Sequence, residues 1–141
     1  MSTPQPFTFT IRVADSDIDR QGHVNNVAFV RYVQEAAVLH WNAVASDELR
    51  AGFTWVVRRH EIEYLRPGLP GDELVVQTWV GEPSGATWER FTQIQRRGED
   101  KPLITARTVW VLLDVNTGRP RRVDPDFVAA FKAEDRLRKE C

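Results

Sequence analysis

One long apolar segment, residues 26–45, constrains the fold more than any other part of the sequence. Its apolar residues recur at helical spacing and spread beyond a single stripe: Val27, Val30, Ala37, Trp41 and Val44 form the stripe, and Phe29, Val33, Ala36 and Val38 widen it. Asn25 or Asn26 is suited to cap this helix, because an Asn side chain accepts a hydrogen bond from a free N–H of the first turn. A helix that is apolar on most sides needs contacts on most sides. We therefore expect it at the centre of the fold.

The segments around this helix have the patterns of β-strands. Residues 7–14 alternate between apolar and polar side chains, and four β-rich segments separated by turn residues follow the helix: 54–65, 72–81, 85–96 and 103–115. Asp124 is expected to cap a final short helix, 124–132, with Pro125 at its first position. This order predicts an α+β fold in which an antiparallel sheet curls around the long helix. The open edges of such a sheet need cover, which a dimer joining two sheets edge to edge provides.

Length and composition limit the other possibilities. The chain has 141 residues and a net charge of −1, which favours one domain with a core at about 7–131 and a charged tail at 133–141, helical or frayed. The near-zero charge argues against nucleic-acid binding, and no apolar run is long enough to span a membrane. The single cysteine, Cys141, allows no internal disulfide, and residues 1–6 lack the features of a signal peptide. We therefore expect a cytoplasmic protein.

The segment from Asp15 to Asn26 contains the candidate catalytic residues. Asp15, Asp17 and Asp19 would share a face in an extended segment, where mutual repulsion raises the pKa of at least one carboxylate. A calcium loop is excluded, because Arg20 and Asn26 stand where glycine and glutamate are required. The aspartates alone are compatible with a solvated turn. A carboxylate beside a helix N-terminus, however, combines a base or nucleophile with N–H groups that stabilise an oxyanion, as ester or thioester hydrolysis requires.

The stretch D-R-Q-G-H-V-N-N-V-A-F at residues 19–29 resembles the signature D-x-x-G-H-V-N-N-x-x-Y/F of the hotdog-fold acyl-CoA thioesterases of the 4-hydroxybenzoyl-CoA thioesterase type. Residues 62–67 with 71–74, and residues 106–120, resemble two further segments of that family. The resemblance implies a hotdog fold, an antiparallel five-stranded sheet wrapped around one long central helix. It also implies homodimers or homotetramers with active sites at a subunit interface, acyl-CoA as the substrate, and no cofactor.

The resemblance implies that Asp19 is the catalytic carboxylate, as nucleophile or as general base for water. It assigns oxyanion-stabilising N–H groups to the helix start or to the loop near Gly52. The implied substrate-binding residues are Gly22, His23, Asn25, Asn26, Val27, Gly52 and Glu35. Relatives often carry an acid at the position of Gln34, and here the acid is its neighbour Glu35, about 100° further round the helix.

Three alternatives to an acyl-CoA thioesterase remain open from the sequence. One is a hydratase or dehydratase of the same fold, in which His23 pairs with Asp19 to move a C–H proton. Another is a non-catalytic acyl-CoA binding module, and a third is a thioesterase acting on acyl carrier protein. A metal site is not expected, because His23, His40 and His60 lack ligand spacing. The tryptophans are expected in the core or at an interface.

Overall fold

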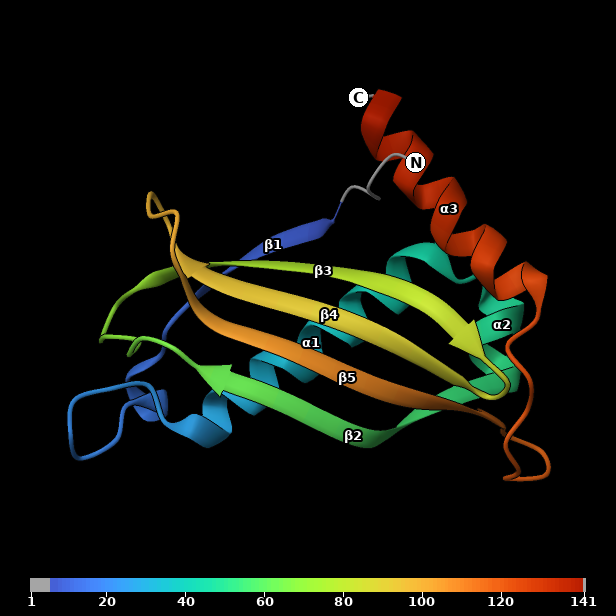
Figure 1. The fold of residues 1–141 in the computed structure, drawn as a ribbon, viewed down its shortest axis with the longest axis horizontal. Coiled ribbons are helices and arrows are strands. Elements are labelled where there is room, and N and C mark those ends of the chain that lie inside the picture. Colours follow the sequence, from blue (N-terminus) through green and yellow to red (C-terminus); the bar gives the residue numbers. More distant parts are fainter. Residues whose placement is uncertain (1–5, 141) are drawn as a thin grey trace.

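Five antiparallel strands wrap around helix α1 in the computed structural model, which describes residues 6–140 and the side chains of residues 6–132 (Figure 1). The strands are β1 (Phe7–Arg12), β2 (Phe53–Tyr64), β3 (Glu73–Ser84), β4 (Thr87–Arg96) and β5 (Pro102–Asp114). The helices are α1 (Asn26–Val44), α2 (Asp47–Gly52) and α3 (Pro125–Glu140). The strand order is β1-β3-β4-β5-β2, so β1 and β2 are the two edges of the sheet. This arrangement confirms the predicted α+β hotdog fold.

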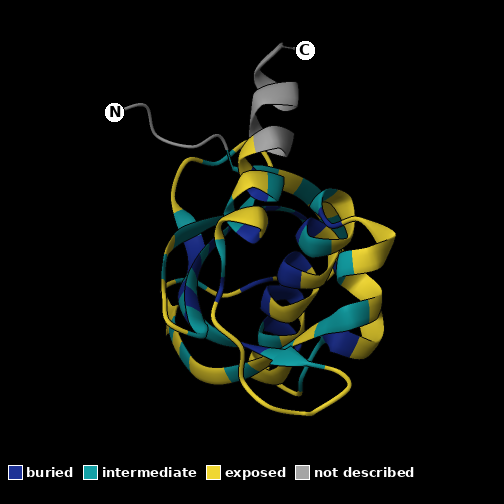
Figure 2. Cartoon of the chain, turned by 90° about the vertical axis from the view of Figure 1, so that its right-hand side faces the viewer, coloured by how far each residue is buried: buried dark blue, intermediate teal, exposed yellow. Residues whose placement is uncertain are grey.

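Helix α1 begins where the sequence predicts. The side chain of Asn25 accepts a hydrogen bond from the N–H of Val27 at 2.8 Å, which caps the first turn. Its buried residues face the concave side of the sheet (Figure 2): Ala28, Phe29, Tyr32, Val33, Ala36, Ala37 and His40. The expectation of contacts on most sides is wrong for one stripe, because Val27 is 73% exposed and Val38 is 52% exposed in the single chain.

Two apolar clusters fill the space between α1 and the sheet, one at each end of the helix. The cluster at the N-terminal end contains Val13, Val24 and Phe29 together with inward residues of β3, β4 and β5. The cluster at the C-terminal end contains Trp88, Leu112 and Phe127, and it is covered by α3. Asp124 precedes α3 as predicted, and its carboxylate accepts from the N–H of Asp126 at 3.0 Å. Both ends of α1 are thereby fixed against the same sheet.

Several element boundaries differ from those predicted. Helix α2 was not expected; Ser46 caps it by accepting from the N–H of Leu49 at 3.2 Å. Strand β3 extends to Ser84 because a register shift between Val80 and Pro83 accommodates the proline. Helix α3 continues past residue 132 to Glu140, so the tail is helical as far as the described residues reach, and Cys141 lies outside them. No helix within residues 6–140 is long and apolar enough to cross a membrane.

Candidate active site

Asp19 opens a tight hairpin that ends at His23. The N–H of Asp19 donates to the carbonyl of His23 at 2.8 Å, and the N–H of Gly22 donates to the carbonyl of Asp19 at 3.0 Å. Gly22 has a φ of +80°, a conformation in which a side chain would be strained. Oδ1 of Asp19 accepts from the N–H groups of Gln21 at 2.9 Å and of His23 at 3.2 Å. Oδ2 has no hydrogen-bond donor within the described part of the chain, so one carboxylate oxygen is held and the other is available.

Asp17 fastens this hairpin to helix α1. Its Oδ2 accepts from Arg31 and from the hydroxyl of Tyr32, both at 2.6 Å. These two hydrogen bonds lower the pKa of Asp17, whereas burial and the neighbouring carboxylate raise the pKa of Tyr32. The direction for Asp17 is opposite to the one expected from repulsion among the three aspartates. The reason is that residues 15–17 form a 3-10 turn and not an extended segment, and that a cation faces Asp17.

Gly68, in the loop between β2 and β3, holds the other side of the hairpin. Its carbonyl accepts from the N–H of Val24 at 2.8 Å. A Cβ atom at this position would lie 2.6 Å from Cγ2 of Val24 and 3.0 Å from the ring of Phe29. Only glycine therefore allows this loop to approach the hairpin so closely.

The first turn of α1 contains the backbone N–H groups that are predicted to stabilise the oxyanion. The N–H of Val27 donates to the capping side chain of Asn25 at 2.8 Å, so it is not a free donor in this structure, and its oxyanion-stabilising role stays a prediction. The N–H of Asn26 has no acceptor among the described residues. The carbonyl of Asn26 accepts from the hydroxyl of Tyr64 at 3.3 Å, which brings the end of β2 to the start of α1.

The predicted site residues other than Gly52 thus divide into three groups. Asp19, Gly22 and His23 lie in the hairpin, and Asn25, Asn26 and Val27 form the adjoining helix start. Glu35 is about two turns further along α1, where its carboxylate lies 3.7 Å from Arg31.

Gly52 does not belong to this site within one chain. It lies at the other end of β2 from Tyr64, a distance of roughly 35 to 40 Å along a strand of this length, and its carbonyl accepts from the N–H of Val115 at 3.1 Å. In the single subunit Gly52 is therefore far from Asp19, because β2 starts beside Gly52 and ends at the hairpin, and the role of Gly52 in the site stays a prediction.

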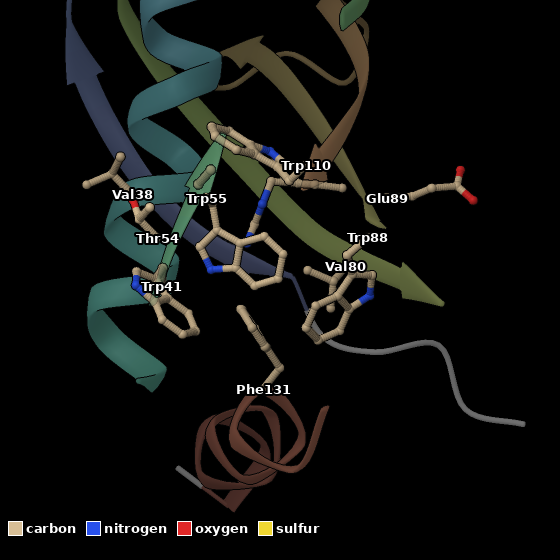
Figure 3. Close-up of a pocket in the computed structure, with 11 residues that line it drawn as sticks. Val38, Trp41, Thr54, Trp55, Val80, Trp88, Glu89, Trp110 and Phe131 are labelled. Carbon is tan, nitrogen blue, oxygen red and sulfur yellow. The ribbon is translucent and has the colours of Figure 1, made fainter. Parts of the chain in front are cut away.

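A pocket lies beside the C-terminal half of α1, away from the hairpin (Figure 3). We call it the aromatic pocket; it is lined by Ala37, Val38, Trp41, Thr54, Trp55, Val80, Trp88, Glu89, Arg90, Trp110 and Phe131. Its volume is about 140 Å³. Val38 and Thr54, on α1 and on the edge strand β2, are exposed, so the pocket reaches the surface on the side of the open sheet edge. Four of the five tryptophans, expected only as core or interface residues, line this pocket.

Sequence reasoning missed the residues that position the hairpin. Arg31, Tyr32, Tyr64 and Gly68 stand 14 to 51 positions after Asp17, and only the fold brings them together. The inward alternation of Trp88 with Arg90 on β4 was the one signal in the sequence for the aromatic pocket. No group of three or more potential metal-ligating side chains occurs among the residues that the structure describes.

Comparison with known proteins places the chain in a family. The model of the thioesterase-like superfamily matches residues 13–131. An acyl-CoA thioester hydrolase, YbgC of Escherichia coli, is 28% identical over 129 residues, which are 89% of this chain and 96% of YbgC. The chloroplastic acyl-acyl carrier protein thioesterase ATL3 of Arabidopsis thaliana is 27% identical over 86% of this chain and 65% of its own length.

Solved structures agree with this placement. A thioesterase from Thermus thermophilus, crystallised with coenzyme A and Zn, is 27% identical and superimposes with a TM-score of 0.80 over 95% of this chain and 97% of its own. The region matched by the family model includes the Asp19 hairpin, all of α1 and the five-stranded sheet apart from β1. The chain therefore belongs to the thioesterase-like superfamily and is a thioester hydrolase.

Proposed function

We propose that the protein hydrolyses acyl-CoA thioesters to a free acid and CoA, with Asp19 as the catalytic carboxylate. The observation that carries this proposal is the state of the Asp19 side chain: Oδ1 is fixed by two backbone N–H groups while Oδ2 is available. A fixed carboxylate with one available oxygen is positioned either to attack a thioester carbonyl or to take a proton from water. The names of YbgC and of the Thermus thioesterase bound to coenzyme A support CoA as the thiol.

The start of α1 is proposed to stabilise the developing oxyanion. The N–H of Asn26 is the donor that the described contacts leave available, and the positive end of the helix dipole adds to it. In the general-base route, Asp19 takes a proton from water and the hydroxide attacks the carbonyl carbon. The C–S bond of the tetrahedral intermediate then breaks, and the thiolate of CoA takes up the proton. In the nucleophilic route, Oδ2 of Asp19 attacks the carbonyl carbon, the C–S bond breaks and CoA leaves as a thiolate. Water then hydrolyses the mixed anhydride, which restores the Asp19 carboxylate and releases the acid, and the proton from water goes to the thiolate.

A homodimer is proposed to complete the site. Strand β2 is an unpaired edge of the sheet. Val56 and Tyr64 on this strand, and Val27 and Val38 on α1, are exposed in the single chain. Antiparallel pairing of two β2 strands about a two-fold axis would set the Phe53 end of one strand beside the Tyr64 end of the other. The Asp19 hairpin lies at the Tyr64 end and the aromatic pocket lies at the Phe53 end.

Such a dimer would therefore bring the hairpin of one subunit to the aromatic pocket of its partner. Within one subunit the two are separated by the 11 to 15 residues between Asn26 and the pocket residues Ala37 and Trp41, or roughly 16 to 22 Å of helix. The dimer offers a shorter path from the thioester to an acyl pocket. It would also bring Gly52 of the partner subunit toward Asp19, where its N–H could stabilise the oxyanion as the resemblance implies. Assembly of such dimers into tetramers stays a prediction.

The experiment that tests this function is thiol release from a panel of acyl-CoA esters, measured beside Asp19→Asn. The amide keeps the hairpin hydrogen bonds at its carbonyl oxygen but is neither a base nor a nucleophile. We expect kcat to fall at least about 100-fold, with unchanged circular dichroism and melting temperature. Asp15→Asn is the matched control, because it removes a similar charge from an exposed position in the same loop.

Other outcomes would contradict the proposal. Turnover by Asp19→Asn within a few-fold of wild type would exclude Asp19 as the catalytic group. Binding of acyl-CoA without thiol release would favour the non-catalytic module, and addition of water to an enoyl-CoA without thiol release would favour the hydratase. Faster hydrolysis of acyl-acyl carrier protein than of acyl-CoA would show that acyl carrier protein, and not CoA, carries the acyl group of the substrate. The cytoplasmic location and the absence of a cofactor stay predictions.

A further inference from the structure

Arg90 is a buried cation at the wall of the aromatic pocket. It projects from β4 toward α1, is 5% exposed, and contacts polar groups through Nη1 alone: Nδ1 of His40 and Oγ1 of Thr78, both at 3.0 Å. Its guanidinium also lies 5.8 Å from the ring centroid of Phe131. The other guanidinium nitrogens have no hydrogen-bond acceptor among the residues that the structure describes.

Among the side chains of residues 6–132, no carboxylate forms an ion pair with this guanidinium. The neighbouring Glu89 is engaged elsewhere, by Arg107 at 2.6 Å. Burial lowers the pKa of Arg90 to about 9. A guanidinium buried without an ion pair among these side chains is costly for the fold, and its presence beside a pocket needs an explanation.

A second unsatisfied donor lines the same pocket. Nε1 of Trp110 is buried and has no hydrogen-bond partner in the described structure. The N–H of Trp88, by contrast, is satisfied by the carbonyl of Gly81 at 2.7 Å. Among the described residues that line the pocket, two therefore keep unused donors, one of them charged, and the one acid, Glu89, is already paired. Such a donor set fits an anionic acceptor and disfavours a purely aliphatic ligand.

The size and the walls of the pocket indicate the rest of the ligand. Indole and phenyl rings of Trp41, Trp55, Trp88, Trp110 and Phe131 surround one space (Figure 3). The volume of about 140 Å³ is close to the roughly 150 Å³ at which an apolar protein cavity binds benzene. One planar ring, stacked or edge-on against these side chains, fits such a space.

We propose that the aromatic pocket selects acyl groups of about one ring in size that end in a carboxylate, with Arg90 and the N–H of Trp110 binding that carboxylate. This inference rests on the proposed function, since it takes the aromatic pocket as the acyl site of the thioesterase. The carboxylate neutralises the buried guanidinium, while the ring replaces water against the tryptophans. Arg90 and Trp110 are then specificity-determining residues and take no part in bond cleavage.

The kinetic test compares 4-carboxybenzoyl-CoA with 4-methylbenzoyl-CoA, which differ only at the distal substituent. We expect wild type to favour the carboxylated ester in kcat/KM by at least about tenfold. Arg90→Met should remove or reverse this preference, Arg90→Lys should retain part of it, and Trp110→Phe should reduce it. Trp88→Phe is the matched control: it removes similar aromatic area and an N–H that does not serve the pocket, so the preference should persist.

The outcomes separate this inference from the proposed function. If wild type hydrolyses both esters equally, or if Arg90→Met keeps the preference, the carboxylate site is overturned while the thioesterase stands. A preference that changes equally in Trp88→Phe and Trp110→Phe would also count against it, because general loss of packing then explains the effect. If Arg90→Met does not fold, the preference for the carboxylated ester is compared between wild type, Arg90→Lys and Trp110→Phe.

A binding measurement needs no catalysis. Tryptophan fluorescence is titrated with 4-carbamoylbenzoate and with 4-methylbenzamide, which carry an amide in place of the thioester. We expect at least about tenfold tighter binding of the carboxylate, lost in Arg90→Met. If neither ester is hydrolysed but this difference appears, the proposed function fails and the carboxylate site stands. Equal binding of the two amides, or binding of neither, overturns the inference.

Discussion

The hydroxyl of Tyr32 on helix α1 donates a 2.6 Å hydrogen bond to Oδ2 of Asp17, two residues before the proposed catalytic carboxylate. Arg31 donates to the same oxygen from the neighbouring position of the helix, also at 2.6 Å. The loop that carries Asp19 is thus attached to α1 through a buried carboxylate and two successive helix residues. The three aspartates of residues 15–19 therefore differ in role: Asp17 holds the loop, and Asp19 is available for the proposed chemistry.

Replacing Asp17 by Asn should destabilise the protein in a pH-dependent way. The folded state lowers the pKa of Asp17 below its ordinary value of 3.8. A carboxylate of this kind adds stability above its unfolded pKa and loses that contribution as pH falls through its folded pKa. We expect Asp17→Asn to cost about 1 to 3 kcal/mol of unfolding free energy at neutral pH.

Urea unfolding of wild type and Asp17→Asn as a function of pH measures this effect. The difference between them should shrink as pH falls below about 4. Asp15→Asn, at an exposed position, should stay within about 0.5 kcal/mol of wild type throughout. A difference between wild type and Asp17→Asn that is constant down to a pH of about 2 would show that the charge of Asp17 contributes nothing.

Gly68→Ala should destabilise the Asp19 hairpin, although residue 68 lies outside it. The new Cβ would approach Cγ2 of Val24 to 2.6 Å, and the buried, β-branched valine has little freedom to move. Overpacking of this kind costs about 1 to 3 kcal/mol, and the displaced Val24 should reduce thiol release as well. Thermal unfolding and kcat are the measurements. Gly52→Ala, where a Cβ meets no atom within 4 Å in the single chain, is the control for stability.

Asn25→Ala should weaken the start of α1. The variant loses the 2.8 Å hydrogen bond from the N–H of Val27, and loss of an N-cap costs about 1 kcal/mol. Asn25→Asp keeps a cap oxygen and adds a negative charge at the positive end of the helix, so it should match wild type in melting temperature. Equal melting temperatures for the alanine and aspartate variants would mean that this cap adds no stability.

A lysine on the open edge of the sheet should weaken the proposed dimer. Val56 on β2 is 42% exposed in the single chain, and lysine on an edge strand opposes edge-to-edge pairing. We expect wild type to sediment as a dimer or a larger assembly. Val56→Lys should dissociate at a higher protein concentration than wild type does, with a parallel loss of activity. Thr8→Lys puts the same charge on β1, at the opposite edge. If dissociation follows Thr8→Lys and not Val56→Lys, the other edge is the interface.

The sequence by itself determined the main helix, the strands and the loop that contains Asp19. Apolar spacing predicted α1 almost to its last residue, and Gly22 with Asn25 marked the hairpin and the cap. Alternation predicted the first strand, and β-rich segments between turn residues predicted the other four. These features are local: helix period, strand period, turn conformation and capping each depend on residues a few positions apart. The family signature lies in one such local segment, which is why residues 19–29 already indicated a thioesterase.

Only the tertiary structure decided which distant side chains surround that loop. Tyr64 and Gly68 reach the start of α1 because β2 runs back along the helix, and the same run carries Gly52 away from Asp19. Arg90 and Trp110 occupy inward positions where the sequence pattern predicts only core. Periodicity specifies the face of a strand on which a residue lies, but strand order and register determine what it meets there. The exposed stripe of α1 has the same origin, since a single chain leaves one side of its central helix uncovered.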